Sequence, residues 1–375
     1  MKLFDVYPLF DIEPIKGEAC YIFDQADNKY LDLYGGHAVI SIGHNHPHFV
    51  EQLSTQVQRL SFYSNSVKNP LQIKLAKLLG KQSGCEGYQL FLCNSGAEAN
   101  ENALKMASFY NERTKIIAFH RAFHGRTSAA VNVTQSDKIK APINKRFEVE
   151  FHPLNQIESV AESLAKEDVC AVIVEGIQGV GGIHLPHPDF LKQLQALCHQ
   201  YNSVLILDEI QSGYGRSGRF FAHQYTDIQP DLITIAKGMG NGFPIGGLLL
   251  HPKFEAKYGL LGTTFGGNHL ACAAGIAVLE VIEKEKLMAH AGHLGCQIMA
   301  ALMRISAIKE VRGSGLMIGV ELDFPVKALR QALLYEDHIF VGSSSNPNVL
   351  RLLPPLNITS EQGFYFVEKL KKRLQ

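Results

Sequence analysis

The sequence has no excess of charge of either sign. Lys and Arg together number 36, and Asp and Glu also number 36. Proteins that hold nucleic acid or anionic lipid present a basic surface, because their partners are polyanions. We therefore expect neither nucleic acid nor membrane as a partner. Charged residues make up only 19% of the chain, which is typical of a protein with much hidden surface, in its core or at a homo-oligomer interface.

Paired cysteines and long apolar runs are also missing. The seven cysteines are odd in number and include no C-x-x-C pair, so neither a disulfide framework nor a zinc ribbon is supported. Cys170 and Cys198 lie in apolar runs and are expected in the core. No apolar run approaches membrane-spanning length, and the start, MKLFDVYPLFDIEP, meets acids and prolines too early for a signal peptide. We therefore expect a cytoplasmic protein.

From about residue 88, short apolar runs alternate with segments of helical periodicity. The apolar runs lie at 89–95, 115–122, 128–134, 147–153, 170–177 and 204–210, and the helical segments at 96–112, 155–167 and 189–202. This alternation predicts an α/β fold with a mostly parallel, doubly wound sheet. In such sheets ligands bind beyond the carboxyl ends of the strands.

Before residue 50 and after about residue 265 the pattern changes to isolated strands and helices. We expect residues 1–45 to form an N-terminal segment that joins a smaller α+β domain. Residues 46–260 should form the large domain, and residues 261–375 the C-terminal small domain. The chain shows no internal repeat and no low-complexity linker.

The run VLILDEI, at 204–210, ends a buried strand with two adjacent carboxylates. An unpaired buried charge is costly, so Asp208 is expected to meet a cationic group. Successive side chains of a strand point to opposite faces, so Glu209 should lie on the other side as a structural acid. Asn94 and Glu175 end two further predicted strands, and we expect them on the same rim as Asp208.

The run QLFLC leads directly into NSGAE, at 94–98, and then into a predicted helix. This arrangement directs the free N–H groups at the start of a helix toward one place, where a phosphate is the ligand that they bind best. The plain alternative is an ordinary N-cap by Asn94 or Ser95, with Glu98 in the first turn.

Lys237 follows another strand-like run, and glycines stand at 238, 240 and 242. A lysine at the end of a strand is commonly a solvated surface residue. A buried lysine with a lowered pKa can instead form a Schiff base with a carbonyl compound. Lys237, an acid for a pyridinium and a helix start for a phosphate together match the needs of pyridoxal phosphate.

Six short motifs follow one another along the chain. They are NSGAEAN at 94–100, FHGRT at 123–127, EGIQG at 175–179, DEIQSG at 208–213, AKG at 236–238 and TFGGN at 264–268. Each is weak alone, but their order resembles that of class III aminotransferases of the ornithine and acetylornithine type, and the resemblance spans nearly the whole chain, from Gly35 to Pro355. The resemblance implies a fold-type-I pyridoxal-phosphate enzyme that works as a homodimer with shared active sites.

The resemblance also implies roles for single residues toward the cofactor. Lys237 would bind the aldehyde and move the substrate proton, and Asp208 would keep the pyridine nitrogen protonated. Gln211 would bond the phenolic oxygen, and Phe123, otherwise a plain core aromatic, would stack on the ring. The phosphate would be bound by Ser95, Gly96 and Ala97, with Thr264 of the partner subunit.

On the substrate side, the resemblance implies that Arg126 grips a carboxylate with its planar fork. Arg351 matches the arginine that binds the α-carboxylate of 2-oxoglutarate, and Tyr7 and Thr263 are assigned to substrate as well. A single arginine is otherwise usually a surface salt-bridge partner. One position departs from the family: relatives commonly carry an acid where this chain has Val180, and that acid pairs with the second arginine while the donor is bound.

Three further segments resemble sites or motifs of other kinds. His44, His46 and His48 alternate as metal ligands in a strand would, but Gly43 and Pro47 break that strand, so we expect a loop and no metal site. The run GSGLMIG at 313–319 resembles a dinucleotide fingerprint, but it precedes a strand-like run, whereas that motif follows one. The run LYGGHAV at 33–39 either lines the substrate entrance or forms a glycine turn.

The expected reaction is transfer of the terminal amine of N-acetylornithine, or N-succinylornithine, to 2-oxoglutarate in arginine synthesis. The products would be the semialdehyde and glutamate. The alternatives on the same scaffold are ornithine, 4-aminobutyrate and diamine aminotransferases. A nucleotide-binding oxidoreductase and a cofactor-free binding protein are alternatives of other classes.

Overall fold

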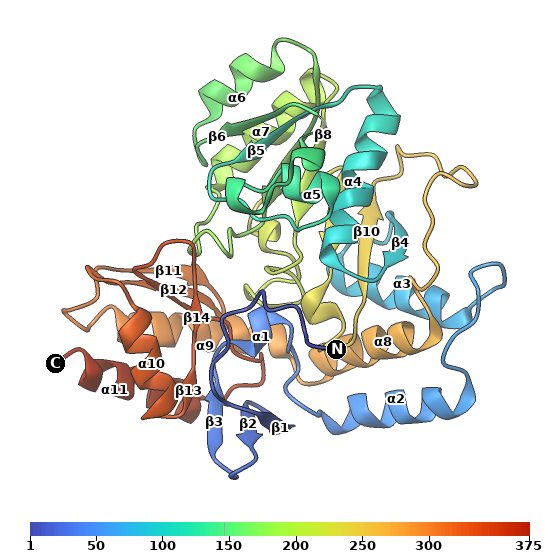
Figure 1. The fold of residues 1–375 in the computed structure, drawn as a ribbon. Helices are drawn as coiled ribbons and strands as arrows, with labels where there is room; N and C mark the ends of the chain where they lie inside the picture. The colour runs from blue at the N-terminus through green and yellow to red at the C-terminus, as the bar shows by residue number, and fades with distance from the viewer. Residues whose placement is uncertain (146) are drawn as a thin grey trace.

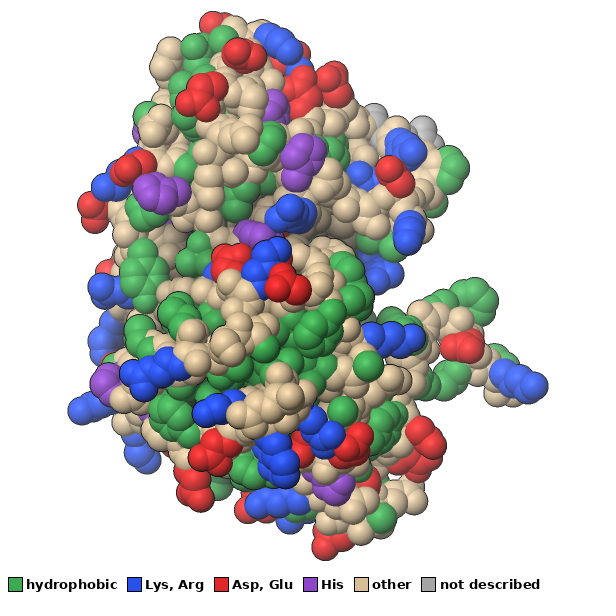
Figure 2. Space-filling view, turned by 90° about the vertical axis from the view of Figure 1, so that its left-hand side faces the viewer, with side chains coloured by type: hydrophobic (Ala, Val, Ile, Leu, Met, Phe, Trp, Pro, Cys, Tyr) green, Lys and Arg blue, Asp and Glu red, His purple; other side chains and the backbone are tan. Residues whose placement is uncertain are grey.

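A computed structural model describes residues 1–145 and 147–375. Figure 1 shows a large part built around a central sheet and, below it, a second part that contains both the N-terminal strands and the C-terminal third of the chain. The first eleven residues are exposed and project from the body as an extended arm (Figure 2). Positive and negative side chains are mixed over the face that Figure 2 shows.

The central sheet has the order β4-β10-β9-β8-β7-β5-β6 within the described residues. Its strands are β4 (Gln89–Cys93), β5 (Lys115–Phe119), β6 (Val149–His152), β7 (Val169–Glu175), β8 (Val204–Asp208), β9 (Leu232–Ile235) and β10 (Gly246–Leu250). Only β10 runs antiparallel to its neighbours, β4 and β9, and the pairs from β9 to β6 are parallel. The prediction of a mostly parallel sheet is confirmed.

Helices cover both faces of this sheet. They are α4 (Gly96–Asn111) and α5 (Ser128–Asn132) on one face, and α6 (Ile157–Leu164) and α7 (Pro188–Gln200) on the other. Alternate residues of one strand point to the two sides: Ile206 packs with the α4 residues Ala103 and Leu104, whereas Leu205 and Leu207 pack with α6 and α7. The β7 and β8 strands are buried along their whole length, as expected of parallel strands covered on both faces.

Further helices lie beside and below the sheet, where α8 packs against α2, α3 and α9. They are α1 (Gly35–Ala38), α2 (Pro47–Arg59), α3 (Pro70–Ser83), α8 (His269–Lys284), α9 (Leu287–Leu302), α10 (Lys327–Tyr335) and α11 (Ser360–Arg373). The sequence sets the limits of α3 clearly. Asn69 Oδ1 accepts from Leu71 N at 3.0 Å, Pro70 takes the first helical position, and Gly84 ends the helix with φ of 69°.

Two smaller sheets complete the second part. One contains β1 (Pro14–Glu18), β2 (Tyr21–Asp24), β3 (Lys29–Asp32) and β13 (Ile339–Phe340), and the other β11 (Glu310–Ser314), β12 (Met317–Glu321), β15 (Val349–Leu352) and β14 (Gly342–Ser343). The N-terminal β3 pairs in parallel with the C-terminal β13. The domain limits at residues 45 and 260 stay a prediction.

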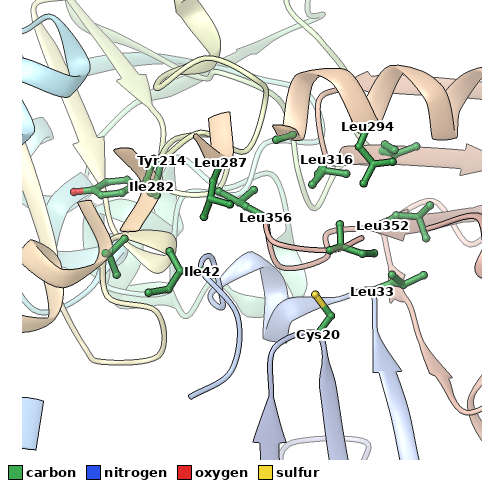
Figure 3. Packing of buried hydrophobic residues seen from close by; sticks show 14 of the residues in the cluster. Cys20, Leu33, Ile42, Tyr214, Ile282, Leu287, Leu294, Leu316, Leu352 and Leu356 are labelled. Atoms are coloured by element: carbon green, nitrogen blue, oxygen red, sulfur yellow. The ribbon is translucent and has the colours of Figure 1, made fainter. Parts of the chain in front are cut away.

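A continuous apolar core joins distant segments of the chain. Figure 3 shows Cys20, Leu33 and Ile42 from the N-terminal segment beside Leu352 and Leu356 from the C-terminal part. Cys170 and Cys198 are buried as predicted. None of the helices described is long and apolar enough to cross a membrane.

Three local expectations from the sequence concern the segments at 44–48, 128–134 and 313–319. The apolar run at 128–134, which the alternation suggests as a strand, forms the short helix α5 instead, because it packs on α4 and does not enter the sheet. His44, His46 and His48 each bond a different carboxylate, of Asp32, Glu285 and Glu280 respectively. In the run GSG, Gly313 and Ser314 end β11, and Gly315 lies in the turn of the hairpin that joins β11 to β12.

Candidate active site

A cavity of about 400 Å³ lies at the carboxyl ends of the central strands. Because β4, β7, β8 and β9 run in the same direction, the residues that follow them share one rim. Asn94, Glu175, Asp208 and Lys237 all line the cavity, as the strand assignment predicts. The other predicted site residues that line it are Ser95, Gly96, Ala97, Phe123, Arg126 and Gln211.

Asp208 is held in a network of donors at the end of β8. Its Oδ2 accepts from Asn100 Nδ2 at 2.8 Å and lies 2.7 Å from His124 Nδ1. Its Oδ1 accepts from the backbone N–H of Ile210 at 3.1 Å. The side chain is buried, yet it borders the cavity. No lysine or arginine of the described chain forms a salt bridge with it, so a cationic ligand would find a prepared counter-ion.

Lys237 begins the short 3-10 helix η4 (Lys237–Met239) directly after β9. Its φ of 45° lies in the left-handed region, which is uncommon for a residue with a side chain and is found at functional sites. Burial lowers the pKa of the amine, and the charge of Arg351 adds to this effect, while Asp208 and Glu175 oppose it. A lowered pKa increases the share of free amine, the nucleophilic form.

The start of α4 forms one wall of the cavity. Ser95 is its N-cap, and its hydroxyl accepts from Glu98 N at 3.2 Å, so the plain N-cap interpretation is correct for Ser95. The N–H groups of Gly96 and Ala97 have no acceptor inside the helix and remain available to an anion. A Cβ on Gly96 would lie 2.8 Å from the Ile210 side chain, so this position has room only for glycine.

Glu175 is a cavity residue to which the sequence assigned no role beyond a place on the rim. Its Oε1 accepts from Phe123 N at 3.1 Å and its Oε2 from Gly179 N at 2.9 Å. Burial, together with the charge of Asp208, raises the pKa of this carboxyl to about 7. The sequence could have suggested a role for Glu175, because this residue ends a buried strand as Asp208 does.

Glu209 points away from the cavity, as the strand alternation predicts. Its carboxylate accepts from Ser212 Oγ at 2.5 Å and from the backbone N–H groups of Ala222 and His223 at 3.0 and 2.9 Å. The His223 ring nitrogen Nδ1 lies 2.8 Å from the same carboxylate. Glu209 therefore ties the segment after β8 to the start of the 3-10 helix η3 (Ala222–Tyr225).

The two predicted substrate arginines have different surroundings. Arg126 is exposed toward the cavity. Arg351 is buried, and its Nη1 donates to Gln211 Oε1 at 3.3 Å while its Nε donates to Ser343 O. In the described chain no carboxylate pairs with Arg351, and Val180, the position at which the family resemblance led us to expect an acid, lines the cavity without a charge.

Gln211 also connects to the segment LYGGHAV. Its Nε2 donates to the carbonyl of His37 at 3.0 Å, and residues 35–38 of this segment all have positive φ. Val39 lines the cavity. The segment is therefore a tight turn and also borders the site. Both alternatives that the sequence left open, a glycine turn and a wall of the substrate entrance, describe it.

Four predicted site residues do not line the cavity of the single chain, and the buried Arg351 is one of them. Thr263 is half-buried, and its Oγ1 accepts from Asn94 Nδ2 at 3.3 Å. Thr264 is exposed. Tyr7 belongs to the N-terminal arm and is 71% exposed.

Comparison with known proteins agrees with this geometry. A family model described as aminotransferase class-III matches residues 6–374. The acetylornithine aminotransferase of Bacillus subtilis is 38% identical over 381 residues, covering 100% of this chain and 97% of that protein. The acetylornithine aminotransferase of Archaeoglobus fulgidus is 40% identical over 350 residues, covering 92% of this chain and 91% of that protein.

Solved structures show the same fold. An ornithine aminotransferase from Toxoplasma gondii superposes with a TM-score of 0.91 and 30% identity, covering 98% of this chain and 91% of that one. An acetylornithine aminotransferase from Elizabethkingia anophelis gives 0.85 and 29%, covering 98% and 94%. The chain therefore belongs to the class-III aminotransferase family, whose members depend on pyridoxal phosphate.

Proposed function

We propose that the protein transfers the terminal amino group of N-acetylornithine, or of N-succinylornithine, to 2-oxoglutarate in arginine synthesis. The products are the corresponding semialdehyde and glutamate. Acetylornithine aminotransferases are 38–40% identical to this chain over 92–100% of its length. The observation that carries the proposal is that one cavity brings together the Lys237 amine, the buried Asp208 carboxylate and the start of α4.

These three groups fit pyridoxal phosphate. The cofactor, when bound, supplies an aldehyde that exchanges amino groups and a pyridinium ring that withdraws electrons from the substrate carbon. Gly96 and Ala97 would hold the phosphate by their N–H groups, with Ser95 beside them. Asp208 would pair with the ring nitrogen, Gln211 with the phenolic oxygen, and Phe123 would cover the ring face.

Lys237 would act as attachment point and as proton carrier. Its lowered pKa keeps part of the amine neutral, so that Nζ can accept a proton from the substrate carbon and return it. Asn100 and His124 both face Oδ2 of Asp208 and would stabilise a negative charge on this carboxylate. Its negative charge would favour the protonated form of the ring nitrogen.

Two arginines would orient the substrates in the two half-reactions. Arg126 would grip the α-carboxylate of the donor from the open side of the cavity, and Arg351 would bind the α-carboxylate of 2-oxoglutarate from the buried side. In the structure, Arg351 has the neutral amide of Gln211 as a partner. Because Val180 supplies no charge, donor preference in this protein depends on groups other than that acid.

We also propose that the protein is a homodimer with shared active sites. Thr264 lies exposed in the single chain and would complete the phosphate site of the partner. Thr263 and Tyr7 would contact substrate only once the two subunits and the N-terminal arm are assembled. A cytoplasmic location stays a prediction.

Borohydride reduction followed by peptide mapping tests the assignment of the site. We expect the reduced cofactor on Lys237, whereas a label on another lysine, or no label, would overturn the proposal. An oxidoreductase or a cofactor-free binding protein would give no adduct. Single-turnover spectra with N-acetylornithine, N-succinylornithine, ornithine, 4-aminobutyrate and a diamine then identify the donor; the similarity to an ornithine aminotransferase structure makes ornithine the main competitor.

A further inference from the structure

The loop that carries Arg126 is fastened to α4 by a single carboxylate. Glu101 lies in the second turn of α4. Its Oε2 accepts from Thr127 Oγ1 at 2.7 Å, from Ala129 N at 2.9 Å and from Ala130 N at 3.0 Å. Its Oε1 also lies 3.0 Å from Ala129 N. The residues that directly follow Arg126 are therefore bound to this carboxylate.

These contacts replace an ordinary helix cap. Thr127 is the N-cap of α5, but its side chain makes no capping hydrogen bond to that helix. Its hydroxyl donates to Glu101 instead, and Glu101 accepts from the second and third N–H groups of α5, those of Ala129 and Ala130. Hydrogen bonds to an ionised carboxylate are stronger than those between neutral groups. Glu101 is thus the main acceptor that keeps the start of α5 in place.

The other side of Arg126 is held by α4 as well. Asn100 Nδ2 donates to the carbonyl of His124 at 2.7 Å. A Cβ on Gly125 would lie 2.8 Å from Ala97 Cβ, so the loop runs very close to the helix. The guanidinium of Arg126 has no hydrogen bond or ion pair of its own within the described residues. Its position therefore depends on the backbone on either side of it.

We propose that Glu101 is a positioning residue that sets the place of the Arg126 guanidinium at the mouth of the cavity. The inference rests on the proposed function, in which Arg126 binds the donor carboxylate. Because Glu101 does not line the cavity, its effect should reach only substrates that use the Arg126 contact.

Two donors separate this role from a general loss of structure. N-Acetylornithine carries the α-carboxylate, whereas N-acetylputrescine has the same reactive amine and acyl group without it. In Glu101→Ala we expect KM for N-acetylornithine to rise roughly 10- to 100-fold, with little change in kcat. The kinetics with N-acetylputrescine should stay unchanged.

Glu101→Gln keeps the shape of the side chain and one acceptor oxygen, so it should raise KM less than Glu101→Ala does. It also serves as the test variant should Glu101→Ala fail to fold. Glu158→Gln is the matched control, because Glu158 lies exposed in the first turn of α6; we expect it to leave both donors unaffected. Arg126→Met, assayed with the same two donors, reports on the proposed role of the arginine itself.

The outcomes are distinct. A selective rise in KM for N-acetylornithine in both Arg126→Met and the Glu101 variants supports the proposal. An equal loss with both donors in the Glu101 variants would mean a general structural role and overturns it. If only Arg126→Met raises KM selectively, the role of Glu101 is overturned and that of Arg126 is kept. If Arg126→Met has no selective effect, both roles are overturned.

Discussion

His124 and Asp208 form a buried pair, with Nδ1 of the imidazole 2.7 Å from Oδ2 of the carboxylate. The contact fits a hydrogen bond in which the imidazole N–H donates and the carboxylate oxygen accepts. The other ring nitrogen, Nε2, is buried without a hydrogen-bond partner among the described residues. Asn100 donates to the same oxygen. Asp208 is therefore fixed in one orientation at the wall of the cavity.

Asp208→Asn should leave the protein folded and slow turnover at least roughly 100-fold. The amide has the size of the carboxylate, but it has no negative charge with which to keep a ring nitrogen protonated. Single-turnover rates of each half-reaction measure the effect, and near-normal turnover would refute the role. Asp231→Asn is the control: Asp231 is also buried, but it pairs with Lys253 and with the N–H of Leu205, so stability should fall while turnover per folded molecule stays.

Glu209→Ala should lower the stability of the protein and leave its turnover unchanged, the opposite of what we expect for Asp208→Asn. Removing this carboxylate leaves the N–H groups of Ala222 and His223 and the hydroxyl of Ser212 without their acceptor. We expect a loss of about 3–5 kcal/mol in the free energy of unfolding, measured by urea denaturation, with kcat per active site retained. A stable variant with lost turnover would mean that the adjacent acids are both catalytic.

Glu175 should make the stability of the cofactor-free protein depend on pH. The pKa of its carboxyl is raised to about 7 in the folded protein, from 4.5. Between these values the folded state binds more protons than the unfolded state, so this group's contribution to stability is present at low pH and is lost as pH rises through about 7. Glu175→Gln removes the titrating group, so the fall in stability between pH 5 and pH 8 should become smaller.

The comparison is made by chemical denaturation at both pH values. Glu158→Gln changes the same chemical group at an exposed position and should leave the difference between pH 5 and pH 8 as it is in the parent protein. If Glu175→Gln has the same pH dependence as the parent, Glu175 titrates at its ordinary value and the assignment is wrong.

Much of the site could be predicted because it depends on strand direction. Strands that run in parallel end at one rim, so the positions of Asp208, Glu175 and Lys237 follow from where their strands end. The alternation of side chains likewise predicts the opposite orientation of Glu209. The contacts of Glu101 could not be predicted, because they join a helix to a loop through space. The helix α5 was not predicted, because its five residues are too few to show helical periodicity and its apolar side chains pack on α4.

Val180→Glu should change the choice of donor without changing the second half-reaction much. The carbonyl of Val180 accepts from Ser345 N at 2.9 Å, and Arg351 bonds the carbonyl of Ser343, so the two residues border the same short segment. A carboxylate at position 180 can pair with the buried guanidinium while a donor is bound. We expect the ratio of single-turnover rates for N-acetylornithine and ornithine to shift by roughly tenfold. Val180→Gln introduces a side chain of the same size as glutamate without its charge and should leave this ratio unchanged. If Val180→Glu changes the rate with 2-oxoglutarate as much as the rates with the donors, Arg351 is not the group through which position 180 acts.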